Sequence, residues 1–154
     1  MDADVQLIWQ TGKFYYKDIV ERLGLDFHPN VHILEFLNRM DLAYAAADLI
    51  ISRAGAGTIA ELCLIKKPVI LVPSPNVAED HQTKNAMALV QQNAALLIAD
   101  RSAEDMLVPE ALALLEDKDR CKLYADNIGK LALPDADNLI AKQVMILAGK
   151  EDRS

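Results

Sequence analysis

Short apolar runs alternate along the chain with longer segments in which apolar residues recur every third or fourth position. The runs predict β-strands and the longer segments predict helices. The run from Val69 to Val72 is rich in β-branched residues, as is typical of a central strand buried on both faces. We expect strands at residues 5–10, 31–34, 49–51, 69–72 and 94–98, and helices at residues 15–23, 40–47, 58–65, 81–92, 106–115, 120–128 and 136–147.

This alternation predicts an α/β fold, a Rossmann-like parallel sheet with right-handed crossovers and helices on its faces. Such sheets bind ligands beyond the carboxyl ends of their strands. Three predicted loops leave carboxyl ends, at residues 35–38, 52–57 and 73–80. They also hold the most distinctive polar and glycine residues, so we expect the functional site there.

Composition narrows the class of protein. The chain has 154 residues, 52% of them hydrophobic, and a net charge of −7. We therefore expect one globular domain over residues 1–148 and a polar tail at 149–154. The negative charge argues against nucleic acid as a partner, because binding it requires clustered Lys and Arg. No apolar run reaches the ~20 residues of a membrane span, and the chain is predicted to be cytoplasmic.

The two cysteines and two of the histidines are assigned no catalytic or metal-binding role. Cys63 and Cys121 lack metal-ligand spacing and lie among apolar or helical residues, so both are predicted to be buried free thiols. His28 and His32 have no visible partner residues for catalysis.

The segment Ser52-Arg-Ala-Gly-Ala-Gly-Thr-Ile-Ala-Glu61 is the strongest candidate for chemistry. We expect Gly55 and Gly57 to permit positive φ and close backbone approach, and Thr58 to open a helix. The unpartnered N–H groups at such a helix start suit an anion, above all phosphate. Because the lysine of a P-loop is absent, the segment is a weaker phosphate signal than a P-loop.

Three motifs together resemble the C-terminal, donor-binding domain of the MurG family, glycosyltransferases of family 28 with the GT-B fold. They are residues 48–61, the Lys67-Pro68 turn with the run to Pro73, and Asp80-His-Gln-Thr-Lys-Asn-Ala86. The resemblance covers nearly the whole chain. It implies binding of UDP-GlcNAc by a hexosyltransferase that adds GlcNAc to undecaprenyl-diphosphate-linked muramyl peptide, converting lipid I to lipid II in peptidoglycan synthesis. It also implies location at the inner face of the plasma membrane, as a peripheral protein.

The same resemblance implies parts that lie outside this sequence. Family members have an N-terminal acceptor domain that engages the lipid diphosphate, and a first βα unit in the donor domain. We expect both to precede Met1 and the chain alone to be inactive. Two alternatives remain: a stand-alone donor subunit of a two-subunit GlcNAc transferase for lipid-linked glycans, and a non-catalytic sugar-nucleotide-binding module.

For the nucleoside, the resemblance implies roles for three residues. Glu61 would accept hydrogen bonds from the ribose hydroxyls, which suits a carboxylate. Its alternative is structural, since Thr58-x-x-Glu61 has the spacing of a capping box. Phe36 and Leu37 would line a uracil pocket, where the backbone at Leu37 pairs with the base. Their alternative is an ordinary place in the core.

For the diphosphate, the resemblance implies binding by the glycine-containing segment 52–61. Ala56, Gly57 and Thr58 would present N–H groups, and Thr58 a hydroxyl, that stabilise the departing UDP without a metal or other cofactor. Arg53 would hold this site or face the diphosphate. The alternative for Arg53 is a solvated or ion-paired side chain.

For the sugar, the resemblance implies contacts of Gln82 and the preceding His81 with the GlcNAc hydroxyls, with Asn85 one turn further along. The alternative is surface capping of a helix with Asp80 as the N-cap. The catalytic base is not identifiable here. It is expected from the acceptor domain or the cleft between domains.

Overall fold

The computed structural model describes residues 4–24, 27–75 and 80–148. The chain divides into two compact units, residues 1–47 (unit 1) and residues 48–154 (unit 2). The expected single domain over residues 1–148 stays a prediction. The predicted polar tail at 149–154 and most of the predicted loop segment 76–80 lie outside the described residues.

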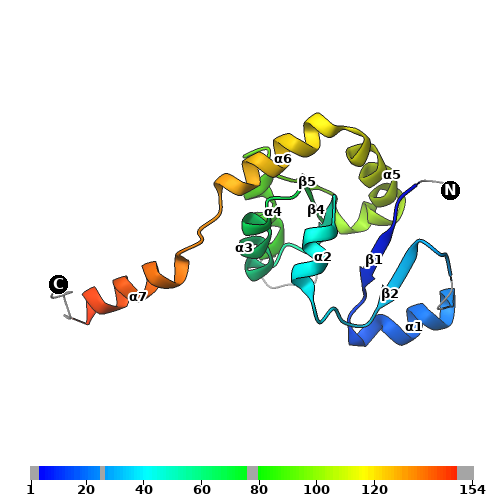
Figure 1. Ribbon diagram of the computed structural model, residues 1–154, viewed down its shortest axis with the longest axis horizontal. Helices are drawn as coiled ribbons and strands as arrows, with labels where there is room; N and C mark the ends of the chain where they lie inside the picture. Colours follow the sequence, from blue (N-terminus) through cyan, green and yellow to red (C-terminus); the bar gives the residue numbers. More distant parts are fainter. Residues whose placement is uncertain (1–3, 25–26, 76–79, 149–154) are drawn as a thin grey trace. The chain divides into compact units, whose positions relative to one another are not determined.

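Unit 1 contains one parallel strand pair. It runs β1 (Leu7–Gln10), α1 (Lys13–Leu23), β2 (Val31–Leu34) and α2 (Met40–Ala46). The two strands lie side by side from the pair Leu7 and Val31 to the pair Gln10 and Leu34, and α1 contacts β2 (Figure 1). Glycines bound α1 at both ends, each with φ of 78°, a conformation that other residues rarely adopt.

Unit 2 contains a three-stranded parallel sheet. Its strands are β3 (Ile50–Ser52), β4 (Val69–Leu71) and β5 (Leu96–Leu97), with β4 in the middle. All three residues of β4 are fully buried, which confirms the predicted central strand. The carboxyl ends of β3, β4 and β5 therefore lie along one edge, as the sequence predicted for parallel strands.

Unit 2 also contains the helices α3 (Ala56–Ile65), α4 (His81–Val90), the short 3₁₀ helix η2 (Asp100–Ser102), α5 (Ala103–Glu116), α6 (Lys118–Lys130) and α7 (Ala136–Leu147). Helix α7 has no buried residue. Helix α3 contacts α4 and α6, and α5 contacts α6. The core joins side chains of β4, the end of β5, α5 and α6: Ile70, Val72, Ile98, Ala111, Leu114 and Tyr124. This packing fixes the loops at the carboxyl ends of the strands.

The start of α3 differs from the prediction. The helix begins at Ala56, with Gly55 as its N-cap, so Thr58 is its third residue rather than its opening residue. No side chain caps this end, so the capping box, the structural alternative for Thr58 and Glu61, is wrong. The positive φ that Gly55 and Gly57 would permit is not adopted by either residue. Gly55 has φ of −66°, and Gly57 lies within the helix, outside the positive-φ residues of the described chain.

The ends of other helices and strands differ from the predicted ends by up to three residues. Helix α5 begins at Ala103 instead of 106, and its N-cap Ser102 makes no side-chain cap hydrogen bond. Helix α6 begins two residues early because Asp117 caps it, its Oδ1 accepting the Arg120 N–H at 2.9 Å. Strand β5 is shorter than the predicted 94–98, although its flanking residues Ala94, Ala95 and Ile98 are buried.

The cysteines are free thiols, as predicted. Cys63 is buried, whereas Cys121 is half-buried and donates its thiol hydrogen to the carbonyl oxygen of Leu114 at 3.0 Å. Burial raises the pKa of both thiols, which keeps them protonated and unreactive. Across the described part of the chain, the helices lack the combination of length and apolar character that crossing a bilayer requires.

Candidate functional site

Two side chains of α4 form hydrogen bonds with the backbone of the loops that follow β3 and β4 in unit 2. The Oε1 atom of Gln82 accepts two backbone N–H groups, from Ala54 at 3.2 Å and from Ser74 at 2.9 Å. Asn85, one turn along α4, donates its Nδ2 hydrogen to the carbonyl oxygen of Ala54 at 3.1 Å. Ala54 is fully buried. Two predicted site residues therefore set the positions of the backbone that follows β3 and β4.

Arg53 connects the ends of all three strands of unit 2. Its Nη1 donates to the carbonyl oxygens of Val72 and Pro73 at 3.1 and 3.4 Å, and it forms an ion pair with Asp100, just after β5. The ion-paired interpretation of Arg53 is thus the one the structure shows, and its contacts hold the loops together. The Arg53 and Asp100 side chains are 56% and 36% exposed, so the ion pair itself contributes below about 1 kcal/mol.

The N-terminus of α3 forms an open donor site. The first helical hydrogen bond runs from the Ile59 N–H to the Gly55 oxygen at 2.9 Å. The N–H groups of Ala56, Gly57 and Thr58 precede it and have no partner within the helix. A Cβ added at Gly57 would meet nothing within 4 Å. This end carries the positive pole of the helix dipole and a clear approach, the two properties that favour an anion.

Glu61 lies on the same side of α3 as this donor site. It follows Gly57 by four residues, which places both on one helix face, and it is exposed. Gly57 and Glu61 are therefore neighbours on the surface of α3.

His81 begins α4 at an exposed position. The preceding Asp80 takes the N-cap position that the capping alternative gave it, but with φ of 56° and without a side-chain cap hydrogen bond. Side-chain capping of α4 by Asp80 is therefore absent.

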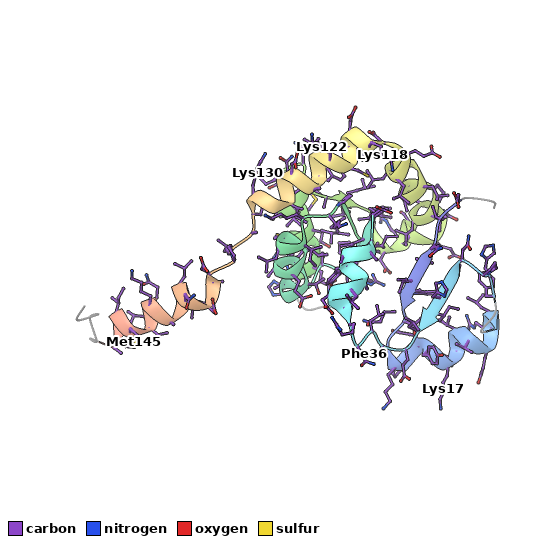
Figure 2. The ribbon with its side chains drawn as sticks, viewed as in Figure 1. Lys17, Phe36, Lys118, Lys122, Lys130 and Met145 are labelled. Carbon is purple, nitrogen blue, oxygen red and sulfur yellow. The ribbon has the colours of Figure 1, made fainter. Side chains whose placement is uncertain are left out.

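The remaining predicted residues lie in unit 1, in the connection between β2 and α2. Phe36, labelled in Figure 2, is 69% exposed, so its interpretation as a core residue is wrong. Leu37 is half-buried. The Leu37 N–H donates to Oε1 of Gln10 at 2.9 Å. This loop thus combines an exposed aromatic ring with a backbone held by a side chain from β1.

Sequence reasoning missed two contributors to these arrangements, Asp100 and Gln10. Each lies at or just after the carboxyl end of a strand, the location that the fold rule marks for function. That position was their only sequence signal. Among the described residues, no group of three or more His, Cys, Asp or Glu side chains could hold a metal ion.

Comparison with known proteins decides the family. The family model described as the glycosyltransferase family 28 C-terminal domain matches residues 1–140. The chain belongs to this family. The resemblance inferred from the three sequence motifs is thereby confirmed.

A curated protein is also similar to this chain in sequence. The chain is 52% identical over 150 residues to the UDP-N-acetylglucosamine--N-acetylmuramyl-(pentapeptide) pyrophosphoryl-undecaprenol N-acetylglucosamine transferase of Bacteroides thetaiotaomicron. The alignment covers 97% of the chain and 40% of the relative. The chain thus spans about two fifths of the length of that curated protein.

Solved structures confirm the α/β fold. The crystal structure of MurG from Acinetobacter baumannii superposes with a TM-score of 0.79 at 26% identity, covering 94% of this chain and 42% of that one. The glycosyltransferase VinC superposes with a TM-score of 0.70 at 19% identity, covering 99% of this chain and 36% of that one, a likeness of fold alone.

Proposed function

We propose that this chain is the UDP-GlcNAc-binding part of a transferase that adds GlcNAc to undecaprenyl-diphosphate-linked muramyl peptide. The observation that carries the proposal is the 52% identity, over 97% of the chain, to a protein named as that transferase. Because the chain spans two fifths of that protein, the proposal assigns the lipid-linked acceptor and the general base to the remaining three fifths. The full protein acts at the inner membrane face.

In this proposal the N-terminus of α3 binds the donor diphosphate. The N–H groups of Ala56, Gly57 and Thr58 and the Thr58 hydroxyl donate to its oxygens. When the bond to GlcNAc breaks, negative charge builds on the departing UDP, and these fixed donors stabilise it. Arg53 contributes by holding the loops through Val72, Pro73 and Asp100. The proposed mechanism needs neither a metal nor another cofactor.

The sugar is assigned to α4. Because Gln82 uses Oε1 for two backbone N–H groups, its NH₂ is the part that donates to a GlcNAc hydroxyl. Asn85 uses Nδ2 for Ala54, so Oδ1 is its remaining acceptor. His81 supplies an exposed imidazole at the helix start. Fixed amides of this kind distinguish hydroxyl patterns, since an unmatched sugar leaves them unpaired.

Glu61 is assigned to the ribose, and the assignment gives a direct prediction. Glu61→Ala removes the acceptor of both ribose hydroxyls, so we expect UDP affinity to fall at least tenfold. The affinity for 2′-deoxy-UDP should fall less, because that ligand has already lost one of the two hydrogen bonds. Calorimetric titration of both nucleotides measures the difference.

The stability of this variant serves as its control. Glu61 is an exposed helix residue and alanine is the best helix former, so the substitution should lower UDP affinity far more than the thermal midpoint. Glu104→Ala, at another exposed helix position, should change neither affinity. A Glu61→Ala chain that binds UDP as tightly as the unaltered chain would refute the ribose assignment.

A further inference from the structure

One nitrogen of the Arg53 guanidinium meets three acceptors. Its Nη1 atom lies within hydrogen-bonding distance of the carbonyl oxygens of Val72 and Pro73, at 3.1 and 3.4 Å, and of Oδ1 of Asp100. An Nη1 atom carries two hydrogens, and a charged acceptor forms the stronger bond. Asp100 therefore takes one hydrogen and the two carbonyl oxygens share the other. The carboxylate thus sets the direction from which Arg53 holds the loop after β4.

The contacts of Arg53 belong to a closed cycle of contacts. Pro73 is followed by Ser74, whose N–H donates to Oε1 of Gln82 at 2.9 Å. The same Oε1 accepts the N–H of Ala54 at 3.2 Å, and Ala54 directly follows Arg53 in the chain. The cycle thus runs from the Arg53 side chain through the loop after β4 to Gln82, and back to the Arg53 backbone. The direction of the Gln82 amide therefore depends on where Arg53 holds Pro73.

Asp100 lies outside this cycle and has a separate support. It is the first residue of η2, just beyond the end of β5. Next to it in the chain, the Ile98 N–H donates to the carbonyl oxygen of Leu71 at 3.0 Å, and the Ile98 side chain is buried. The sheet and the core therefore set the place of Asp100. A carboxylate held in this way can orient a partly exposed arginine.

We propose that Asp100 is a positioning residue for the donor sugar, acting through Arg53 on the Gln82 amide, an inference that rests on the proposed UDP-GlcNAc-binding function. In that function the NH₂ of Gln82 donates to a GlcNAc hydroxyl, and Asp100 touches no part of the ligand. Without its carboxylate the guanidinium is free to turn, and the Gln82 amide loses its fixed direction. The α3 N-terminus is the proposed diphosphate site, so Asp100 affects the preference for UDP-GlcNAc over UDP rather than the affinity for UDP.

The test measures the dissociation constants of UDP and UDP-GlcNAc by calorimetric titration. Asp100→Ala should reduce the preference for UDP-GlcNAc over UDP about fivefold and leave UDP affinity unchanged. Asp100→Glu keeps a carboxylate and should restore most of the preference. Because both side chains of the ion pair are partly exposed, salt screens the pair. The difference between Asp100→Ala and the unaltered chain should therefore shrink in about 1 M salt, which a loss of packing alone would not produce.

A double substitution tests whether Asp100 acts through Arg53. In a chain that already carries Arg53→Gln, adding Asp100→Ala should cause no further loss of preference, because the side chain that transmits the effect is gone. Losses that simply add would overturn the proposal.

Asp105→Ala is the matched control, because Asp105 is another exposed carboxylate, in the first turn of α5, and should change neither constant. If the unaltered chain binds UDP-GlcNAc no better than UDP, the proposed function and this inference both fail. If it prefers UDP-GlcNAc, and Asp100→Ala keeps that preference or weakens both ligands equally, the inference alone fails. Should Asp100→Ala not fold, Asp100→Asn, which has the same shape, decides by the same criteria.

Discussion

Replacing Gly57 with leucine is expected to abolish UDP binding, with a loss of at least a hundredfold, and to leave the chain folded. Gly57 is the second residue of α3, and a Cβ there meets no atom within 4 Å. The Cβ of a leucine therefore has open space in the free protein, and we expect the rest of its side chain to occupy space in front of the helix N-terminus. The proposed diphosphate would lie in that space.

Stability should change in the opposite direction to affinity. Glycine in a helix is about 1 kcal/mol less favourable than alanine, and leucine is nearly as good as alanine. The thermal midpoint of Gly57→Leu should therefore equal or exceed that of the unaltered chain. Ala113→Leu adds a leucine at an exposed position of α5 and should keep full UDP affinity. Undiminished UDP binding by Gly57→Leu would exclude a diphosphate at this helix end.

Gln82→Leu is expected to destabilise unit 2 by about 2–4 kcal/mol, the largest stability effect among these variants. The leucine cannot accept the N–H groups of Ala54 and Ser74, and each part-buried N–H left without a partner costs about 1–3 kcal/mol. The two loops they belong to follow β3 and β4. Urea unfolding followed by circular dichroism measures the loss of unfolding free energy.

Two variants separate the structural role of Gln82 from its proposed contact with the sugar. Gln82→Glu keeps an acceptor for both N–H groups and should retain stability, but it lacks the NH₂ and should lose the preference for UDP-GlcNAc over UDP. Gln91→Leu alters an exposed glutamine after α4 and should change stability by less than about 0.5 kcal/mol. Equal stabilities of Gln82→Leu and Gln91→Leu would contradict the account of the loops.

The sequence was sufficient for the order and type of the elements because those depend on local periodicity. The run Val69–Val72 shows this well: its β-branched residues predicted a buried central strand, and β4 lies in the middle of its sheet. Boundaries were less predictable. Ala56 and Gly57 are weak signals for a helix start, yet both lie within α3, because Gly55 takes an extended conformation just before it.

Gly57 shows how tertiary structure can leave a residue's conformational freedom unused. Its sequence context permitted positive φ and close backbone approach, whereas in the structure it lies within α3, where an added Cβ would meet no atom within 4 Å. For Gln10 and Asp100 the sequence indicated a position near the carboxyl end of a strand but not the contacts that they make. Their partners lie 27 and 47 residues away, and no local pattern specifies which side chains meet across strands.

A calorimetric titration of the chain with UDP-GlcNAc, UDP and ADP tests the central claim most directly. The three ligands share a diphosphate, so a bare helix N-terminus would bind UDP and ADP alike. Our account predicts that UDP binds at least tenfold more tightly than ADP, and UDP-GlcNAc more tightly than UDP. Equal affinities for UDP and ADP would contradict it.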